Sequence, residues 1–303
     1  MKNLFVLMLA SLALTSCAEK KKEEDLLSGG SEISCAENVT TNMTASAFEA
    51  LIQNGTSPTT PFVICIHAGA SVNAGGGGNI NISAEDVMIL GEDTATSALT
   101  NVNLTSGFTW SPSVSFVNLK INGVGAPAIN AGLGDSRDAS VSISDSVISS
   151  NSSGISLSAG NAGSANVIVS GTTITSNNDS VVVGVGNAGQ IQASIEDSTF
   201  LTNAKAVSLG AGDAGILTVE LGANTFKASG ATSSASTAMT FSVGAAGITQ
   251  IDNTSSTKHR VCNVSGSAHT FNQVYTSSGA TASGSFSIAN TLNTNNSTIG
   301  TCP

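Results

Sequence analysis

The stretch Gly160-Asn161-Ala162-Gly163 decides the fold, because it returns along the chain at a constant interval. It recurs at residues 186–189 and, with Asp in place of Asn, at residues 212–215, so the residue number of each motif rises by a constant step of 26. A fourth copy at residues 244–247 follows after 32 residues, which predicts a six-residue insertion near residues 229–236. A fixed period of this length is the sequence signature of a solenoid, in which each coil packs on its neighbours.

Apolar residues keep the same step and so predict continuous columns along a solenoid axis. The columns are Val141/Val167/Ala193/Val219, Ile143/Val169/Ile195/Leu221, Ile148/Ile174/Phe200/Phe226, Ile155/Val181/Val207/Met239 and Leu157/Val183/Leu209/Phe241. Within a coil these positions come in pairs two residues apart, which is the period of a β-strand. We therefore predict an all-β fold, a right-handed parallel β-helix of about 26 residues per coil, over residues 35–262.

Other residues recur with the same step of 26. Asn151, Asn177 and Asn203 form a polar column, which we expect to bond along the axis and cap a turn. The glycines that open each motif, residues 160, 186 and 212, are expected to supply backbone angles forbidden to other residues.

The ends of a solenoid need caps, because open coils expose unpaired strand edges. Ser46 and Glu49 have the spacing of a capping box, which predicts a short N-terminal capping helix over residues 46–54 that stops at Gly55. Residues 263–303 are rich in Ser, Thr and Asn and are expected to form a C-terminal cap.

The order of these segments resembles the pectin-lyase-like β-helix superfamily. The predicted helix is followed by the run from Val63 to Gly69 and then by residues 80–83 and 87–91, which are similar to the early coils of that superfamily. Phe200-Leu201-Thr202-Asn203 resembles the F-x-x-N half-repeat of polymorphic outer-membrane β-helix proteins. The resemblance implies the fold and leaves the activity open, because this fold carries many functions.

The N-terminus has the pattern of an exported lipoprotein. Lys2 and an apolar run from Leu4 to Leu14 are typical of a signal peptide over residues 1–16, since the run is too short to span a bilayer. The following Leu14-Thr15-Ser16-Cys17 resembles the lipobox of bacterial lipoproteins, which implies lipidation of Cys17. Ala18 after the cysteine then favours the outer membrane of the cell envelope. The alternative is an ordinary secretory signal with a chance cysteine.

Residues 17–34 are mixed in charge and end in small polar residues, so we expect a lipidated cysteine followed by a flexible tether. The four remaining cysteines allow three disulfide pairings. In an elongated solenoid the two ends are far apart, which favours Cys35–Cys65 and Cys262–Cys302.

The low content of charged residues limits the classes of partner that the chain is expected to bind. The formal net charge is −10 and only 10% of residues are charged, so the chain has no electrostatic footprint for nucleic acid. The expected partners are the membrane, through the lipid anchor, and a polysaccharide or envelope protein.

Few residues are candidates for catalysis or for ligand binding. Asp135, Arg137 and Asp138 form the best acid–base grouping and are weak catalytic candidates for a polysaccharide lyase or glycoside hydrolase. Phe108 and Trp110 are weak candidates for stacking on a sugar, with core packing as the alternative. The three histidines have no recognisable catalytic partner and are interpreted as structural or surface residues.

We predict no metal site and no cofactor, although one column could hold Ca²⁺ between coils. Its members are Asp135, Asn161, Asn187 and Asp213. Asp and Asn are also ordinary turn residues. The sequence favours a non-catalytic surface, adhesion or glycan-binding protein over an enzyme that cleaves acidic glycans, because the predicted flanks carry hydroxyls and few charges.

Overall fold

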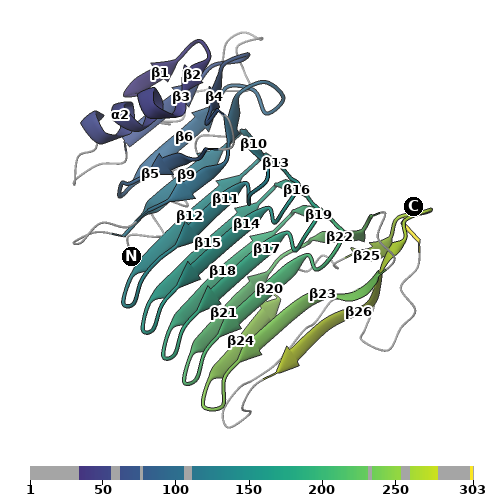
Figure 1. Ribbon diagram of the computed structural model, residues 1–303. Coiled ribbons are helices and arrows are strands. Elements are labelled where there is room, and N and C mark those ends of the chain that lie inside the picture. Colours follow the sequence, from purple (N-terminus) through teal and green to yellow (C-terminus); the bar gives the residue numbers. More distant parts are fainter. Residues whose placement is uncertain are drawn as a thin grey trace, which may run out of the picture.

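The structure, a computed structural model, describes residues 34–55, 62–75, 78–105, 111–230, 234–253, 260–278 and 301–302. These residues form a parallel β-solenoid with three sheets that run along its length (Figure 1). Successive strands belong to sheets 1, 2 and 3 in turn, and each pairs in parallel with the strand one coil away. The predicted fold class is confirmed, and so is the length of a coil, because Asn166 lies beside Ser140, which precedes it by 26 residues. The right-handed sense of winding stays a prediction.

The strands of each sheet follow one another along the axis. Sheet 1 contains β1 (Glu37–Val39), β3 (Phe62–Ile66), β6 (Val87–Gly91), β9 (Ser113–Val117), β12 (Asp138–Ser144), β15 (Ser164–Ser170), β18 (Gln190–Glu196), β21 (Ile216–Leu221) and β24 (Ile248–Asn253). Sheet 2 contains β2 (Met43–Thr44), β4 (Ser71–Asn73), β7 (Ala98–Thr100), β10 (Lys120–Gly123), β13 (Val147–Ser150), β16 (Thr173–Ser176), β19 (Thr199–Thr202), β22 (Thr225–Ala228) and β25 (Arg260–Asn263). Sheet 3 contains β5 (Ile80–Ile82), β8 (Val102–Leu104), β11 (Ile129–Gly132), β14 (Ile155–Ala159), β17 (Val181–Val185), β20 (Val207–Ala211), β23 (Ser234–Val243) and β26 (His269–Ser278).

The predicted columns are confirmed by the strand register. Ile143 pairs with Val169, which pairs with Ile195, and the other four columns pair in the same way. All of these side chains are buried and belong to one hydrophobic core that runs through the solenoid. Aligned Phe200 and Phe226 stack with their ring centroids 5.2 Å apart, a favourable geometry for aromatic pairs.

The predicted insertion is also present, between β22 and β23. Val207 pairs with Met239, and Asp213 bonds to Ala245, with a separation of 32 residues in each case. The longer coil therefore keeps the register of the columns on both sides of it.

The N-terminal cap is a helix, but its start differs from the prediction. α2 runs over Ala45–Gly55, and the backbone N–H of Ala47 donates to Thr44 Oγ1 at 3.3 Å. Thr44 thus takes the N-cap role that the capping box assigned to Ser46, and its donor is Ala47 in place of Glu49. Glu49 is engaged elsewhere, because its carboxylate accepts a bond from the Asn81 side chain on the first strand of sheet 3.

Glu49 therefore ends an asparagine ladder. Asn103 donates to Asn81 Oδ1 and Asn130 donates to Asn103 Oδ1, each over 3.0 Å. The ladder ties the helix side chain to three coils. A single sequence cannot distinguish this contact from a local cap, because both satisfy the carboxylate.

At the other end, parallel pairing extends past residue 262, where the sequence predicted the C-terminal cap to begin. β26 pairs with β23 in parallel, with a register shift after Ser236. Residues 279–300 lie outside the described part of the chain.

Both predicted disulfides are present. Cys35–Cys65 joins the start of the described chain to β3, and Cys262–Cys302 joins β25 to the C-terminus. Each bond therefore fixes one end of the solenoid.

Candidate binding surface

The repeated Gly-Asn-Ala-Gly turn connects sheet 3 to sheet 1 and builds a ladder of side-chain hydrogen bonds. Asp135 Oδ1 accepts from the backbone N–H of Asn161 at 2.7 Å. In the same way Asn161 Oδ1 accepts from the backbone N–H of Asn187, and Asn187 Oδ1 accepts from the backbone N–H of Asp213, at 3.0 Å each. The last rung joins Asp213 to the backbone N–H of Ala245. Each side chain thus caps the turn of the next coil.

This ladder corrects the expected role of the glycines. Residues 160, 186 and 212 do not have positive φ; instead Ala162, Ala188 and Ala214, two residues later, have φ of 55–57°. A Cβ placed on Gly186 would lie 2.7 Å from Asn161 Oδ1. The glycines are therefore needed for space, since the ladder side chain of the preceding coil lies against them.

The three catalytic candidates lie in the first of these turns and at the start of β12, and the two aspartates accept hydrogen bonds from the next coil. Asp138 Oδ1 accepts from both the backbone N–H and the hydroxyl of Ser164, at 2.9 and 2.6 Å. The Arg137 carbonyl accepts from the same N–H. No salt bridge among the described residues joins Arg137 to either carboxylate. Asp135 and Asp138 thus accept hydrogen bonds from the next coil, as the asparagines of the ladder do.

One carboxylate oxygen of each aspartate in this ladder accepts a backbone N–H bond, and the Ca²⁺ alternative stays a prediction. Within the described part of the chain no group of three or more His, Cys, Asp or Glu could hold a metal ion.

A second ladder lies inside the solenoid, at the corner between sheets 1 and 2, and the sequence analysis missed it. Thr172 donates its backbone N–H to Ser198 Oγ at 3.2 Å, and the Ser198 hydroxyl donates to the Glu196 carbonyl at 2.7 Å. The coils on either side of these two place Ser146 and Asn224 there with equivalent bonds. The signal that could have revealed it is a hydroxyl or amide residue at the same constant step.

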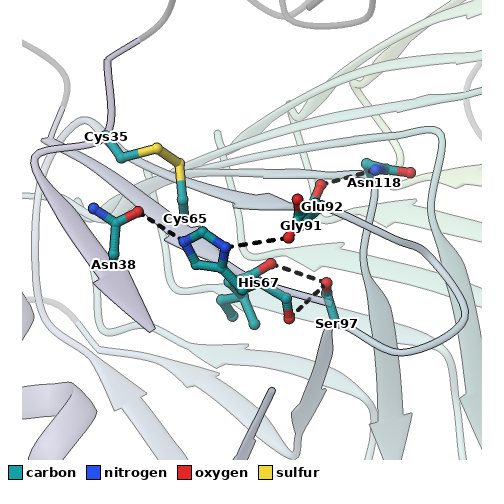
Figure 2. Close-up of a disulfide and its surroundings, with 9 residues drawn as sticks. Cys35, Asn38, Cys65, His67, Gly91, Glu92, Ser97 and Asn118 are labelled. Atoms are coloured by element: carbon teal, nitrogen blue, oxygen red, sulfur yellow. Dashed lines mark hydrogen bonds and ion pairs between the residues drawn. A yellow bond between two sulfur atoms is a disulfide. The ribbon is translucent and has the colours of Figure 1, made fainter. Parts of the chain in front are cut away.

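Two histidines are held by polar partners, in agreement with their structural interpretation. Figure 2 shows His67 beside the Cys35–Cys65 disulfide, with its Nδ1 3.2 Å from Glu92 Oε2 and its Nε2 3.1 Å from Asn38 Oδ1. The fully buried His269 has Nδ1 2.7 Å from Ser234 Oγ and Nε2 3.0 Å from the Ala204 carbonyl. His259 lies outside the described residues.

An accessible polar surface lies on the outer side of sheet 1 on β15, β18, β21 and β24, and we name it the polar face. Its side chains alternate with the core positions of the same strands. The central row is Asn166, Gln192, Thr218 and Gln250, with Ser140 one coil earlier. Asn166 donates to Ser140 Oγ at 3.1 Å, whereas Gln192 and Gln250 are exposed.

Apolar and acidic groups flank this row. Ile216 and Ile248 lie on one side and are 37% and 39% exposed. Glu220 lies on the other side, next to Ser194 in the neighbouring strand. The polar face thus offers amides, hydroxyls and apolar contacts at the coil spacing of about 4.8 Å.

One carboxyl group, in the turn after β12, is distinguished by its partial burial. Asp145 lies in the turn after β12 with φ of 48°, and burial raises its pKa above the ordinary carboxyl value. Gly171 occupies the same position one coil on, where a Cβ would lie 2.6 Å from Asp145 Oδ1. Asp197 follows at the next coil with the same φ.

Three candidate residues lie outside the described part of the chain. They are Cys17, Phe108 and Trp110, so lipidation and sugar stacking stay predictions. No helix of the described residues is long and apolar enough to cross a membrane.

Comparisons with known proteins give no identification. No family model, no curated protein and no solved structure matched this chain. The solenoid architecture agrees with the β-helix fold that the resemblance implied, and the superfamily itself stays a prediction.

Proposed function

We propose that the protein is an exported, lipid-anchored envelope protein whose β-solenoid binds extended glycans through the polar face without cleaving them. The observation that carries this proposal is the use of the predicted acid–base residues. Asp135 and Asp138 accept hydrogen bonds from the next coil, so they serve the stability of the turn. The solenoid is left with a long, regular, sparsely charged surface.

The chemistry of the polar face suits a neutral polymer better than a charged one. Exposed amides of Gln192 and Gln250 can donate and accept hydrogen bonds with sugar hydroxyls, and the exposed Ile216 and Ile248 can contact the apolar side of a sugar ring. A polymer aligned with the axis would meet similar groups about every 4.8 Å. Many weak contacts of this kind add up along a chain through multivalency.

Export is supported by the disulfides, because such bonds persist in oxidising compartments such as the periplasm or the extracellular space. The lipid anchor itself rests on the lipobox-like sequence before Cys17. Replacing Cys17 by Ser should move the protein from the membrane fraction to the soluble fraction. Unchanged fractionation would contradict lipidation without bearing on glycan binding.

A glycan array and affinity electrophoresis in neutral and acidic polysaccharides test the binding role. We expect Gln192→Ala with Gln250→Ala to weaken binding at least several-fold. The matched control is Ser156→Ala with Ser208→Ala, on the outer side of sheet 3, which should leave binding unchanged. Equal loss in both double variants, or no binding to any glycan, would remove the proposal.

The enzyme alternative has one observation in its favour. Burial raises the pKa of Asp145, and a general acid needs a raised pKa. Asp197 lies two coils away, roughly 9.6 Å at the coil spacing, near the upper end of the separation typical of inverting glycosidases. Release of reducing ends from a polysaccharide panel, lost in Asp145→Asn and in Asp197→Asn, would favour a hydrolase over a binding protein.

A further inference from the structure

The outer side of sheet 1 changes character along the axis, and its first coils are apolar. Val63, Cys65, Met88, Leu90 and Val117 alternate with the core residues of β3, β6 and β9, so they face away from the core. We name these five residues the apolar patch. They lie on the same side of the sheet as the polar face, several coils earlier.

The apolar patch is largely buried although it faces outward. Leu90 is 3% exposed and Val117 is 1% exposed. Cys65, Leu90 and Val117 form a hydrophobic cluster separate from the main core, and Cys35 packs against it. Burial fades along this column of sheet 1, because Ser144 is still buried whereas Ser170 and Glu196, which follow it coil by coil, are partly exposed. The low exposure of these outward side chains points to a cover over the first coils that ends after Ser144 in β12.

One polar group under this cover lacks a partner. The hydroxyl of Ser144 is buried and makes no hydrogen bond. Ser144 pairs with Val117 in the register of sheet 1, so the hydroxyl lies at the margin of the apolar patch. A buried polar group usually bonds to backbone or side-chain atoms, and a peptide segment above the patch would offer such atoms.

The path of the chain identifies the segment. Cys35 is held on the apolar patch by its disulfide to Cys65 (Figure 2), so the residues before it leave the solenoid at this place. Between Ala18 and Ser34 the large apolar residues are Leu26, Leu27 and Ile33. The rows from Cys65 to Ser144 are three coils apart, roughly 14 Å at the coil spacing. About five extended residues cover that distance, which is fewer than residues 26–34 contain.

We propose that residues 26–33 dock on the apolar patch as a strap, with Leu26, Leu27 and Ile33 against Met88, Leu90 and Val117. The docking needs no lipid, but its consequence rests on the proposed anchor at Cys17. The free tether then shrinks to residues 17–25, at most about 30 Å when extended. The first coils are thereby kept near the membrane, and the polar face at the other end is presented away from it.

Cysteine accessibility tests the strap in the full chain carrying Cys17→Ser, so that the result does not depend on lipidation. Val117→Cys should react with a maleimide at least tenfold more slowly than Ile216→Cys, which is exposed on the same sheet. Replacing Leu26, Leu27 and Ile33 by Ser should bring the two rates within about threefold. Ser144→Cys is a second, nearly isosteric reporter in case Val117→Cys does not fold, and it should respond in the same way.

The opposite outcomes overturn the proposal. Fast labelling of both reporters in the chain with the intact strap would mean that the apolar patch is uncovered. Protection that persists in the triple serine variant would assign the cover to another occupant. Loss of that protection on dilution would identify a second copy, and loss in Phe108→Ser with Trp110→Ser would identify residues 106–110. Membrane fractionation of Cys17→Ser tests the anchor separately, so failure of the strap and failure of the anchor are distinguishable.

Discussion

The internal ladder at the corner of sheets 1 and 2 makes a specific prediction for Ser198→Ala. The hydroxyl of Ser198 accepts from the backbone N–H of Thr172 and donates to the Glu196 carbonyl. The carbonyl keeps a second partner, because it also accepts from the N–H of Gly171. The buried N–H of Thr172 loses its acceptor. An unsatisfied buried donor costs about 1–3 kcal/mol, so the free energy of unfolding should fall by that amount.

Chemical denaturation monitored by circular dichroism measures this loss. The control is Ser194→Ala in the same coil, whose side chain faces outward and is partly exposed, so we expect a change within about 0.5 kcal/mol. Ser198→Thr should restore most of the stability, because the preceding coil already uses Thr172 in this column. The reasoning is refuted if Ser198→Ala and Ser194→Ala cost the same, or if Ser198→Thr is as unstable as Ser198→Ala.

Three further predictions concern the turns and the ends. Gly186→Ala should destabilise the protein by at least about 1 kcal/mol, because the new Cβ overlaps the ladder side chain of the preceding coil. Gly184→Ala is the control and should be tolerated, because its Cβ meets nothing within 4 Å. Thermal unfolding of the two variants measures the difference. Burial raises the pKa of Asp145, so the folded state disfavours its ionised form and loses stability as the pH rises through the raised pKa. Asp145→Asn should therefore be more stable than the parent at pH 7, with no such gain near about pH 3; equal gains at both pH values would contradict this assignment. Replacing Cys262 and Cys302 by Ser, which removes a disulfide with a sequence separation of 40 residues, should cost about 3–5 kcal/mol, and hydrogen exchange should rise in β25 while β6 is unaffected.

Much of the fold could be predicted from the sequence because each core position of a solenoid recurs at a fixed interval along the chain. Residues such as Ile143, Val169 and Ile195 repeat their chemistry at each coil, and their contacts follow from the period alone. The disulfide pairing followed from the same elongated shape.

Contacts that depend on local geometry could not be predicted. The small size of Gly186 is needed for the Asn161 side chain of the preceding coil, whereas the left-handed angle falls on Ala188. Sequence alone gives no sign of which of the two effects selects a glycine.

The candidate site was less predictable than the fold. Asp135 and Asp138 are residue types that could form an acid–base pair, and only the structure shows that both accept hydrogen bonds from the next coil. The proposed strap is a further case, since residues 26–33 have the composition of an ordinary linker. The outward apolar residues of β6 and β9 become informative only when their register separates them from the core.

The ladder of the Gly-Asn-Ala-Gly turns has a direction. Each side-chain oxygen accepts from a backbone N–H of the coil that follows, from Asp135 through Asn161 and Asn187 to Asp213. The series ends at Ala245, whose methyl side chain has no acceptor atom. A further coil, or a second molecule stacked end to end, would find no acceptor for its turn at this place. The replacement of one amide by a methyl group thus ends this ladder, and a coil beyond it would have to hold its turn without the side-chain bond.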